Sequence, residues 1–105
     1  MEKMRLVVLA DLPTTTRHER KVARVFQEWL FANGFSALQE GVFTRTTDGR
    51  TSAEMQSRRL CANRPETGSV RLFTMTESQF KNGLLVAGEE TVQESEIGSQ
   101  LDIFL

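Results

Sequence analysis

The stretch LVVLADLPTTT, residues 6–16, decides the fold that we predict for this chain. Its first five residues are all apolar, which is typical of a strand buried on both faces of a sheet. Pro13 cannot donate a backbone hydrogen bond to a neighbouring strand, so the strand must end near Asp11. Asp11 therefore stands at the carboxyl end of a buried strand, where α/β folds commonly meet ligands and metal ions. The alternative is that Asp11 caps the turn formed by residues 12–16.

Three Ser/Thr-x-x-Glu/Gln patterns predict where helices begin, because such a pair of side chains can satisfy the free amide groups of a first helical turn. The pairs are Thr16 with Glu19, Thr51 with Glu54, and Thr76 with Gln79. The first helix runs to Asn33 and ends at Gly34, and the second runs to about Asn63. The apolar stripe of the first helix comprises Val22, Val25, Phe26, Trp29 and Leu30. We expect this stripe to lie on the sheet, with Trp29 in the core.

The remaining apolar stretches predict four more strands. Residues 35–45 read as one strand in which Gly41 marks a bulge or a close backbone approach, and residues 69–75 alternate as a strand does. Residues 84–87 form a short apolar strand, and residues 101–105 regain a strand pattern after a polar segment. This order predicts an α+β fold, a ferredoxin-like β-α-β-β-α-β sandwich with an extra C-terminal strand.

The chain divides into a ferredoxin-like core domain, residues 1–88, and an acidic linker with a terminal strand, residues 89–105. The terminal strand carries four large apolar side chains, those of Leu101, Ile103, Phe104 and Leu105. A frayed tail would leave these side chains in water, so we expect the strand to pair within the chain, with a partner subunit or with an associated protein. One domain of 105 residues has a small stability margin, which also favours a homodimer.

Composition excludes several classes of protein. A single cysteine, Cys61, allows no internal disulfide, and the chain has no cluster of cysteine and histidine that would bind zinc. No window approaches the roughly 18 consecutive apolar residues of a membrane span, and the first residues do not resemble a secretory signal. We therefore expect a cytoplasmic protein.

The net charge of −1 hides an uneven distribution, with 12 basic and 8 acidic residues in 1–76 but 1 basic and 6 acidic residues in 77–105. Four basic residues open the first helix, namely Arg17, Arg20, Lys21 and Arg24. The positive end of the helix dipole adds to their attraction for anions, so we expect them to bind nucleic-acid phosphates without reading sequence. The alternative is an ordinary solvated helix face. His18 lies among them, and we expect it to be a solvated residue rather than a catalytic base.

Several stretches together resemble the CRISPR-associated protein 2 family, the small subunit of the machinery that captures foreign DNA as new spacers. They are LVVLADLPT at 6–14, NGF at 33–35, QEGVF at 39–43 and GSVRLFTMT at 68–76, and the matches span about residues 4–88. The Asp-Leu-Pro-Thr form is similar to the branch that accompanies single-effector, Cas9-type systems. The resemblance implies a twofold homodimer of ferredoxin-like subunits with facing sheets, in which the last strand crosses to the partner.

The same resemblance implies a role in spacer acquisition, in which the homodimer holds double-stranded DNA and bridges two copies of a dimeric integrase. Some members of the family cut single-stranded RNA or double-stranded DNA with magnesium, and Asp11 matches the family's strand-end aspartate. Asp11 is thus implied as the catalytic residue and the Mg²⁺ ligand. Because magnesium takes six oxygen ligands, we expect two copies of Asp11 to share the ion at the dimer axis.

Two other functions fit the residues, a stand-alone toxin-like small ribonuclease and a ferredoxin-like regulatory dimer that binds a small ligand. The chain has no glycine-rich phosphate cradle, and its cationic helix start suits a polymer better than a small ligand. Between a DNA scaffold and a metal-dependent endonuclease we favour the scaffold. Bridging would use the dimer, the arginines and the terminal strand, whereas cleavage depends on Asp11 alone.

Overall fold

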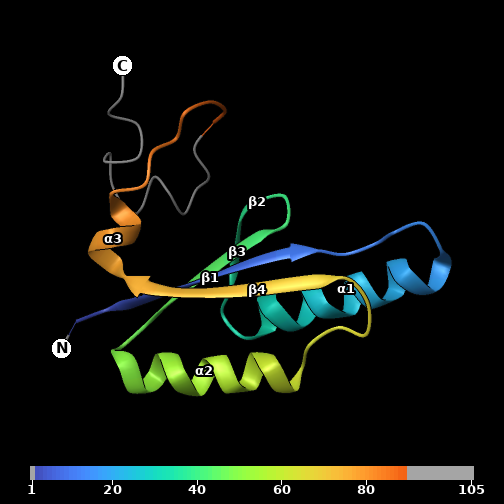
Figure 1. Ribbon diagram of the computed structural model, residues 1–105, viewed down its shortest axis with the longest axis horizontal. Coiled ribbons are helices and arrows are strands. Elements are labelled where there is room, and N and C mark those ends of the chain that lie inside the picture. The colour runs from blue at the N-terminus through green and yellow to red at the C-terminus, as the bar shows by residue number, and fades with distance from the viewer. Residues whose placement is uncertain (1, 90–105) are drawn as a thin grey trace.

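The computed structural model describes residues 2–89, which form a four-stranded antiparallel sheet and three helices (Figure 1). The elements are β1 (Met4–Asp11), α1 (Arg17–Ala32), β2 (Ser36–Gln39), β3 (Val42–Thr47), α2 (Arg50–Ala62), β4 (Ser69–Thr76) and α3 (Glu77–Lys81). Across the sheet the strand order is β2-β3-β1-β4, and every neighbouring pair is antiparallel. This is an α+β arrangement compatible with the predicted ferredoxin-like sandwich. None of the helices within residues 2–89 is long and apolar enough to cross a membrane.

β1 lies at the centre of the sheet, with one face covered by helices and the other partly open. The core on the covered face comprises Met4, Leu6, Val8, Phe26, Leu30, Phe35, Phe43, Ala53 and Leu60. On the opposite face Leu9 is 38% exposed, and the side chain of Asp11 is also exposed. The prediction that this strand is buried on both faces is therefore wrong within the described residues, because α1 and α2 pack on the same face of the sheet (Figure 1).

Residues 35–45 form a hairpin instead of the single strand that we predict from sequence. The chain reverses between β2 and β3 at Glu40 and Gly41, and Gly41 has φ +75°, a value that favours glycine. The pairing shifts register between Ala37 and Gln39, so a bulge lies next to this turn. Gly41 also approaches the backbone of β1 closely, since a Cβ atom added to it would lie 2.8 Å from the Ala10 carbonyl oxygen.

Two of the three predicted helix starts have the expected capping geometry. Thr16 with Glu19 and Thr76 with Gln79 form complete capping boxes at α1 and α3. The box predicted for Thr51 and Glu54 is wrong, because α2 begins at Arg50. Its N-cap is Gly49, with φ +103° and no capping side chain, so the tight turn before the helix fixes the start one residue earlier.

Residues 84–87 do not form the predicted strand. After α3 ends at Lys81, this segment lies outside every helix and strand of the described chain. Leu84, Leu85 and Ala87 line a hollow together with Val7 and Met75, whose side chains belong to the open face of the sheet. The segment thus packs its side chains against that face instead of extending a sheet edge. The predicted linker and terminal strand, with Leu101, Ile103, Phe104 and Leu105, fall outside the described residues.

Candidate nucleic-acid interface

Asp11 is the last residue of β1, at the end of the sheet where α1 begins (Figure 1). Two glycines with positive φ, Gly41 and Gly68, lie in close contact with the backbone at this end of β1. The amide of Ala10 donates to the carbonyl oxygen of Gly41 at 2.7 Å, and a Cβ atom on Gly68 would lie 2.7 Å from the carbonyl oxygen of Asp11. A side chain at either glycine would displace this end of β1, so the close contacts fix the position of Asp11.

The side chain of Asp11 is exposed and accepts no hydrogen bond within residues 2–89. The turn that follows is held by other groups. Arg20 Nη1 donates to the carbonyl oxygens of Thr14 and Thr15 at 3.2 and 3.0 Å, and Glu19 Oε1 accepts from the amides of Thr15 and Thr16 at 3.1 and 2.9 Å. The alternative in which Asp11 caps this turn is therefore not what the structure shows, and the carboxylate remains available to a ligand.

Within residues 2–89, a single chain does not form a complete metal site. No group of three or more His, Cys, Asp or Glu side chains gathers anywhere in this part of the chain. Asp11 thus provides one carboxylate towards a magnesium ion that takes about six oxygen ligands. The donor set of a single chain fits such an ion only in part, and a second carboxylate would have to come from another copy.

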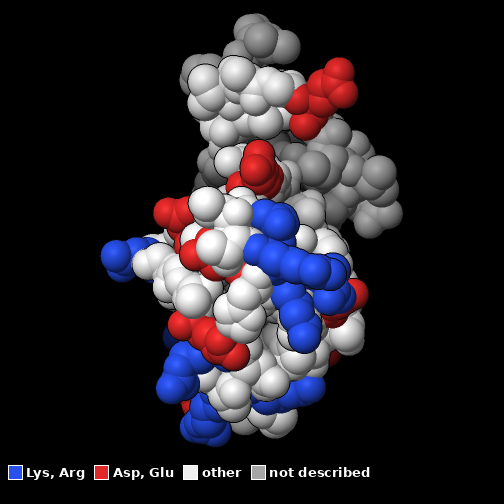
Figure 2. Space-filling model, turned by 90° about the vertical axis from the view of Figure 1, so that its right-hand side faces the viewer, with Lys and Arg blue, Asp and Glu red and all other residues white. Residues whose placement is uncertain are grey.

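The four basic residues predicted to bind phosphates do come together. One shallow hollow is lined by Arg17, Arg20, Lys21 and Arg24 together with His18, and all four basic residues are exposed. Figure 2 faces this end of the molecule and shows basic side chains gathered on it. They lie on the first two turns of α1, at the positive end of its dipole. The geometry therefore presents one cationic surface, which we call the α1 basic surface and define by these four residues.

The four basic residues differ in how far the chain already engages them. Arg20 holds the turn that precedes α1, and Arg24 pairs with Glu28 one helical turn later at 2.8 Å. Arg17 and Lys21 form no ion pair within the described residues. These two residues can therefore bind an external anion without breaking an ion pair within the described residues. Sequence spacing alone does not separate them from Arg20 and Arg24.

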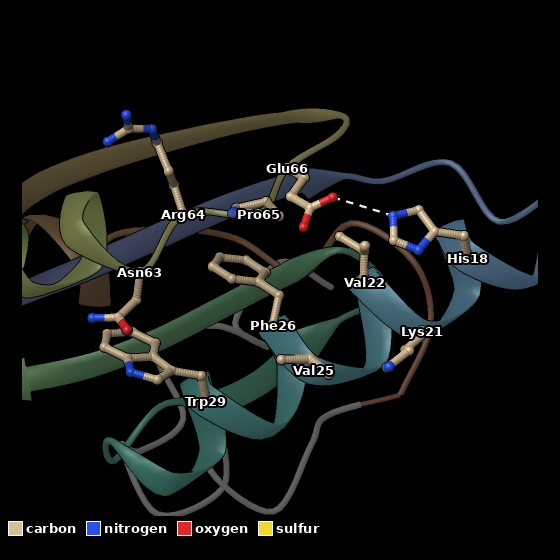
Figure 3. A pocket seen from close by; sticks show the side chains of 10 residues that line it. All are labelled: His18, Lys21, Val22, Val25, Phe26, Trp29, Asn63, Arg64, Pro65 and Glu66. Atoms are coloured by element: carbon tan, nitrogen blue, oxygen red, sulfur yellow. Dashed lines mark hydrogen bonds and ion pairs between the residues drawn. The ribbon is translucent and has the colours of Figure 1, made fainter.

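His18 links the start of α1 to the connection between α2 and β4. Its Nε2 atom lies 3.1 Å from Oε2 of Glu66, and both side chains are largely exposed. This contact closes one end of a groove between α1 and residues 63–66 (Figure 3). Sequence reasoning missed the groove because it placed Val25 and Trp29 in the stripe that faces the sheet. Val25 is 51% exposed instead, and Trp29 is only partly buried.

A second charged site at the other end of β1 was also missed. Arg5 Nε and Nη2 donate to Oε1 and Oε2 of Glu77 at 2.8 and 2.7 Å, and the Arg5 guanidinium lies 4.4 Å from the centre of the Phe80 ring. The Arg5 side chain is only 3% exposed. Seventy-two residues separate the pair, so no local signal in the sequence could have revealed it.

Comparison with known proteins places the chain in a family. It is 35% identical over 102 residues to the CRISPR-associated endoribonuclease Cas2 of Acidovorax ebreus, covering 96% of this chain and 100% of the relative. Identity is 34% over 99 residues with the Cas2 of Flavobacterium psychrophilum, covering 94% and 86% of the two chains. With the Cas2 of Streptococcus mutans it is 32% over 102 residues, covering 97% and 93%.

No protein-family model matches the chain. The curated relatives nevertheless agree in name and cover nearly the whole chain, which confirms the resemblance that the sequence motifs indicate. The chain therefore belongs to the family of the CRISPR-associated endoribonuclease Cas2.

Proposed function

We propose that this chain is a subunit of CRISPR spacer acquisition whose homodimer binds double-stranded DNA and bridges integrase dimers. The α1 basic surface carries the proposal, because four cations gathered at one end of a subunit suit a phosphate backbone and read no sequence. Two subunits would repeat this surface across a twofold axis. The terminal residues 101–105, outside the described part of the chain, would supply a further contact to the partner subunit or the integrase.

Duplex binding is tested best with Arg17 and Lys21, the two residues of the α1 basic surface without an ion pair in residues 2–89. We expect the Arg17→Ala/Lys21→Ala variant to weaken duplex binding. Its slope of log affinity against log salt should flatten by about 0.9 for each phosphate that the variant no longer neutralises. The matched control is Arg50→Ala/Arg58→Ala, which removes two exposed arginines from α2. Equal slopes in wild type and the Arg17/Lys21 variant would reject the assignment.

The open sheet face supports the homodimer. Leu9 and Phe73 lie on it at 38% and 48% exposure, on strands β1 and β4 that pair directly. Two such faces packed together would remove apolar surface from water, and would bring both copies of Asp11 towards the axis because Asp11 shares a face with Leu9. Phe73→Glu should therefore give a monomer by light scattering, while Met55→Glu, a similarly exposed position on α2, should leave the dimer intact. A dimeric Phe73→Glu variant would refute this interface.

Metal-dependent cleavage is a second candidate activity, favoured by the exposed carboxylate of Asp11 and by the endoribonuclease name of the relatives. In this proposal the two Asp11 carboxylates of the dimer would hold one Mg²⁺ ion. Such an ion supplies positive charge that lowers the pKa of a bound water and offsets charge on the phosphate. The α1 basic surface would orient the substrate beside them. Asp11→Ala should abolish magnesium-dependent cutting of single-stranded RNA or double-stranded DNA while dimerisation persists. Cutting at the wild-type rate would reject Asp11 as the catalytic residue.

A further inference from the structure

The groove between α1 and residues 63–66 has a volume of about 300 Å³ and an apolar floor. Figure 3 shows the Phe26 ring and Pro65 facing each other across it, with Trp29 at one end and the His18–Glu66 contact at the other. Val25 belongs to the floor and is half exposed, on a helix whose neighbouring surface is basic. A hollow of this volume falls at the lower end of the range that holds small organic groups.

The groove and the α1 basic surface are continuous. His18 and Lys21 line both the groove and the hollow formed by the basic side chains. Arg64 also lines the groove, but its guanidinium points away from it and donates to the Cys61 carbonyl oxygen (Figure 3). Among the described residues that line the groove, Glu66 alone is acidic, and it lies against His18. An apolar slot with an aromatic ring therefore opens directly onto a cationic surface.

This combination has a specific chemical match. A nucleobase has two apolar π faces and is joined through its sugar to an anionic phosphate, so it needs an apolar or aromatic slot beside positive charge. A charged surface without a slot serves duplex phosphates equally well, because paired bases are stacked inside the helix and do not reach it. The apolar floor is thus the feature that duplex binding leaves unexplained.

We propose that the groove binds an unpaired base of single-stranded nucleic acid, whose phosphates lie on Arg17 and Lys21. The proposal rests on the proposed function, since it uses the same basic surface, and it adds a base-binding subsite beside that surface. Both RNA and DNA contain such bases, and separate RNA and DNA strands distinguish them. The base would contact Val25, Trp29 and Pro65, which come from α1 and from the α2–β4 connection, above the buried ring of Phe26.

The chain offers an intrinsic signal for the test. Trp29 is the only tryptophan of the chain, and the chain contains no tyrosine. The full-length protein is titrated with three DNA ligands: a single-stranded oligonucleotide, the same strand without its bases, and a duplex. The two single strands are also tested as RNA. We expect the single strand to quench Trp29 emission and to bind about tenfold more tightly than the abasic strand. The duplex should bind without quenching.

A pair of matched variants locates the effect. Val25→Gln changes the floor of the groove, and Met55→Gln changes an equally exposed position on α2, at 52% exposure. Neither alters the charge. Val25→Gln should weaken single-strand binding about threefold and leave duplex binding unchanged, while Met55→Gln should change neither.

The outcomes separate the two proposals. If the single strand and the abasic strand bind alike and leave Trp29 emission unchanged, the groove is not a base site, although duplex binding still stands. If neither duplex nor single strand binds, the proposed function fails as well. If Trp29 emission instead changes with protein concentration alone, the groove belongs to a contact between copies and this inference is overturned.

Discussion

The charged side chains at the two ends of β1 differ in their burial and in their partners. Arg5 and Asp11 lie six residues apart on the same face of the strand, which is about 20 Å. Arg5 is buried, pairs with Glu77 through two hydrogen bonds and stacks on Phe80. Asp11 is exposed, and its carboxylate has no partner within residues 2–89.

This difference indicates that the charge of Arg5 stabilises the fold, whereas the charge of Asp11 is available to bind a ligand. A buried ion pair with good geometry fixes how α3 docks on the sheet, and removing either partner would leave the other uncompensated. An exposed carboxylate at a rigid strand end contributes little to stability, so its identity is free to be set by chemistry. Substitutions at both ends of the strand test this contrast.

The largest expected effect is at the Arg5 end. Glu77→Ala leaves a buried guanidinium without its carboxylate, which should lower the free energy of unfolding by about 3–5 kcal/mol. Arg5→Met removes the more deeply buried charge, together with an Nη1 atom that is buried without a partner in the described residues. It should cost less, because the Glu77 carboxylate that it leaves is 18% exposed and can contact water. Urea unfolding of both variants measures this. A loss below about 1 kcal/mol for Glu77→Ala would mean that the pair is solvated.

The next effect concerns the backbone at the Asp11 end. Gly68→Ala places a Cβ atom 2.7 Å from the Asp11 carbonyl oxygen at φ +90°, so we expect a loss of about 1–3 kcal/mol. Gly88→Ala is the matched control, because Gly88 has φ +103° with no atom within 4 Å. The same urea titrations compare them. Equal losses would show that the close contact at Gly68 relaxes without cost.

A smaller effect is expected for the Asp11 side chain. Asp11→Asn should change the free energy of unfolding by no more than about 0.5 kcal/mol, because the carboxylate is exposed and has no partner in residues 2–89. The same variant should lose magnesium-dependent cleavage if that activity is present. A large loss of stability would give Asp11 a structural role and remove the contrast with Arg5.

The smallest effect lies beside the Arg5 end, at the exposed pair of Lys3 and Asp48. A hydrogen bond of 2.7 Å from Lys3 Nζ holds the pKa of Asp48 below its ordinary value, and Asp48 raises the pKa of Lys3. A carboxyl group with a lowered pKa in the folded state stabilises the fold at pH values above its pKa in the unfolded state. This contribution is lost as the pH falls through the pKa in the folded state. In Lys3→Gln the pKa of Asp48 should rise, as NMR titration would show. High salt should reduce the difference between the pKa of Asp48 in the wild type and its pKa in Lys3→Gln.

Local signals in the sequence predicted much of this fold. Capping boxes at Thr16 and Thr76 are formed by residues three apart, so they can be recognised without knowing the tertiary structure. The basic residues of α1 are also neighbours on one helix, and their common surface follows from helical spacing.

The errors arose where distant segments decide the outcome. Whether residues 84–87 pair as a strand depends on where the chain carries them after α3. They line a hollow with Val7 and Met75 on the open face instead of pairing with the edge strands β2 or β4. The open face of β1 follows from α1 and α2 packing on one side of the sheet. The predicted ferredoxin-like sandwich places its helices on one face, whereas the apolar run of β1 taken alone indicates burial on both. The groove beside Trp29 depends likewise on where residues 63–66 pass α1.

The central position of β1 also has a consequence for how the chain folds. Both of its neighbours, β3 and β4, come later in the sequence, and its contact with Glu77 spans 72 residues. The second edge of β1 is therefore paired only after nearly the whole described chain has been synthesised. Contacts of such long range make folding slow, so we expect milliseconds to seconds rather than microseconds. During that interval an apolar strand stays unpaired, and rapid synthesis at high concentration should favour aggregation.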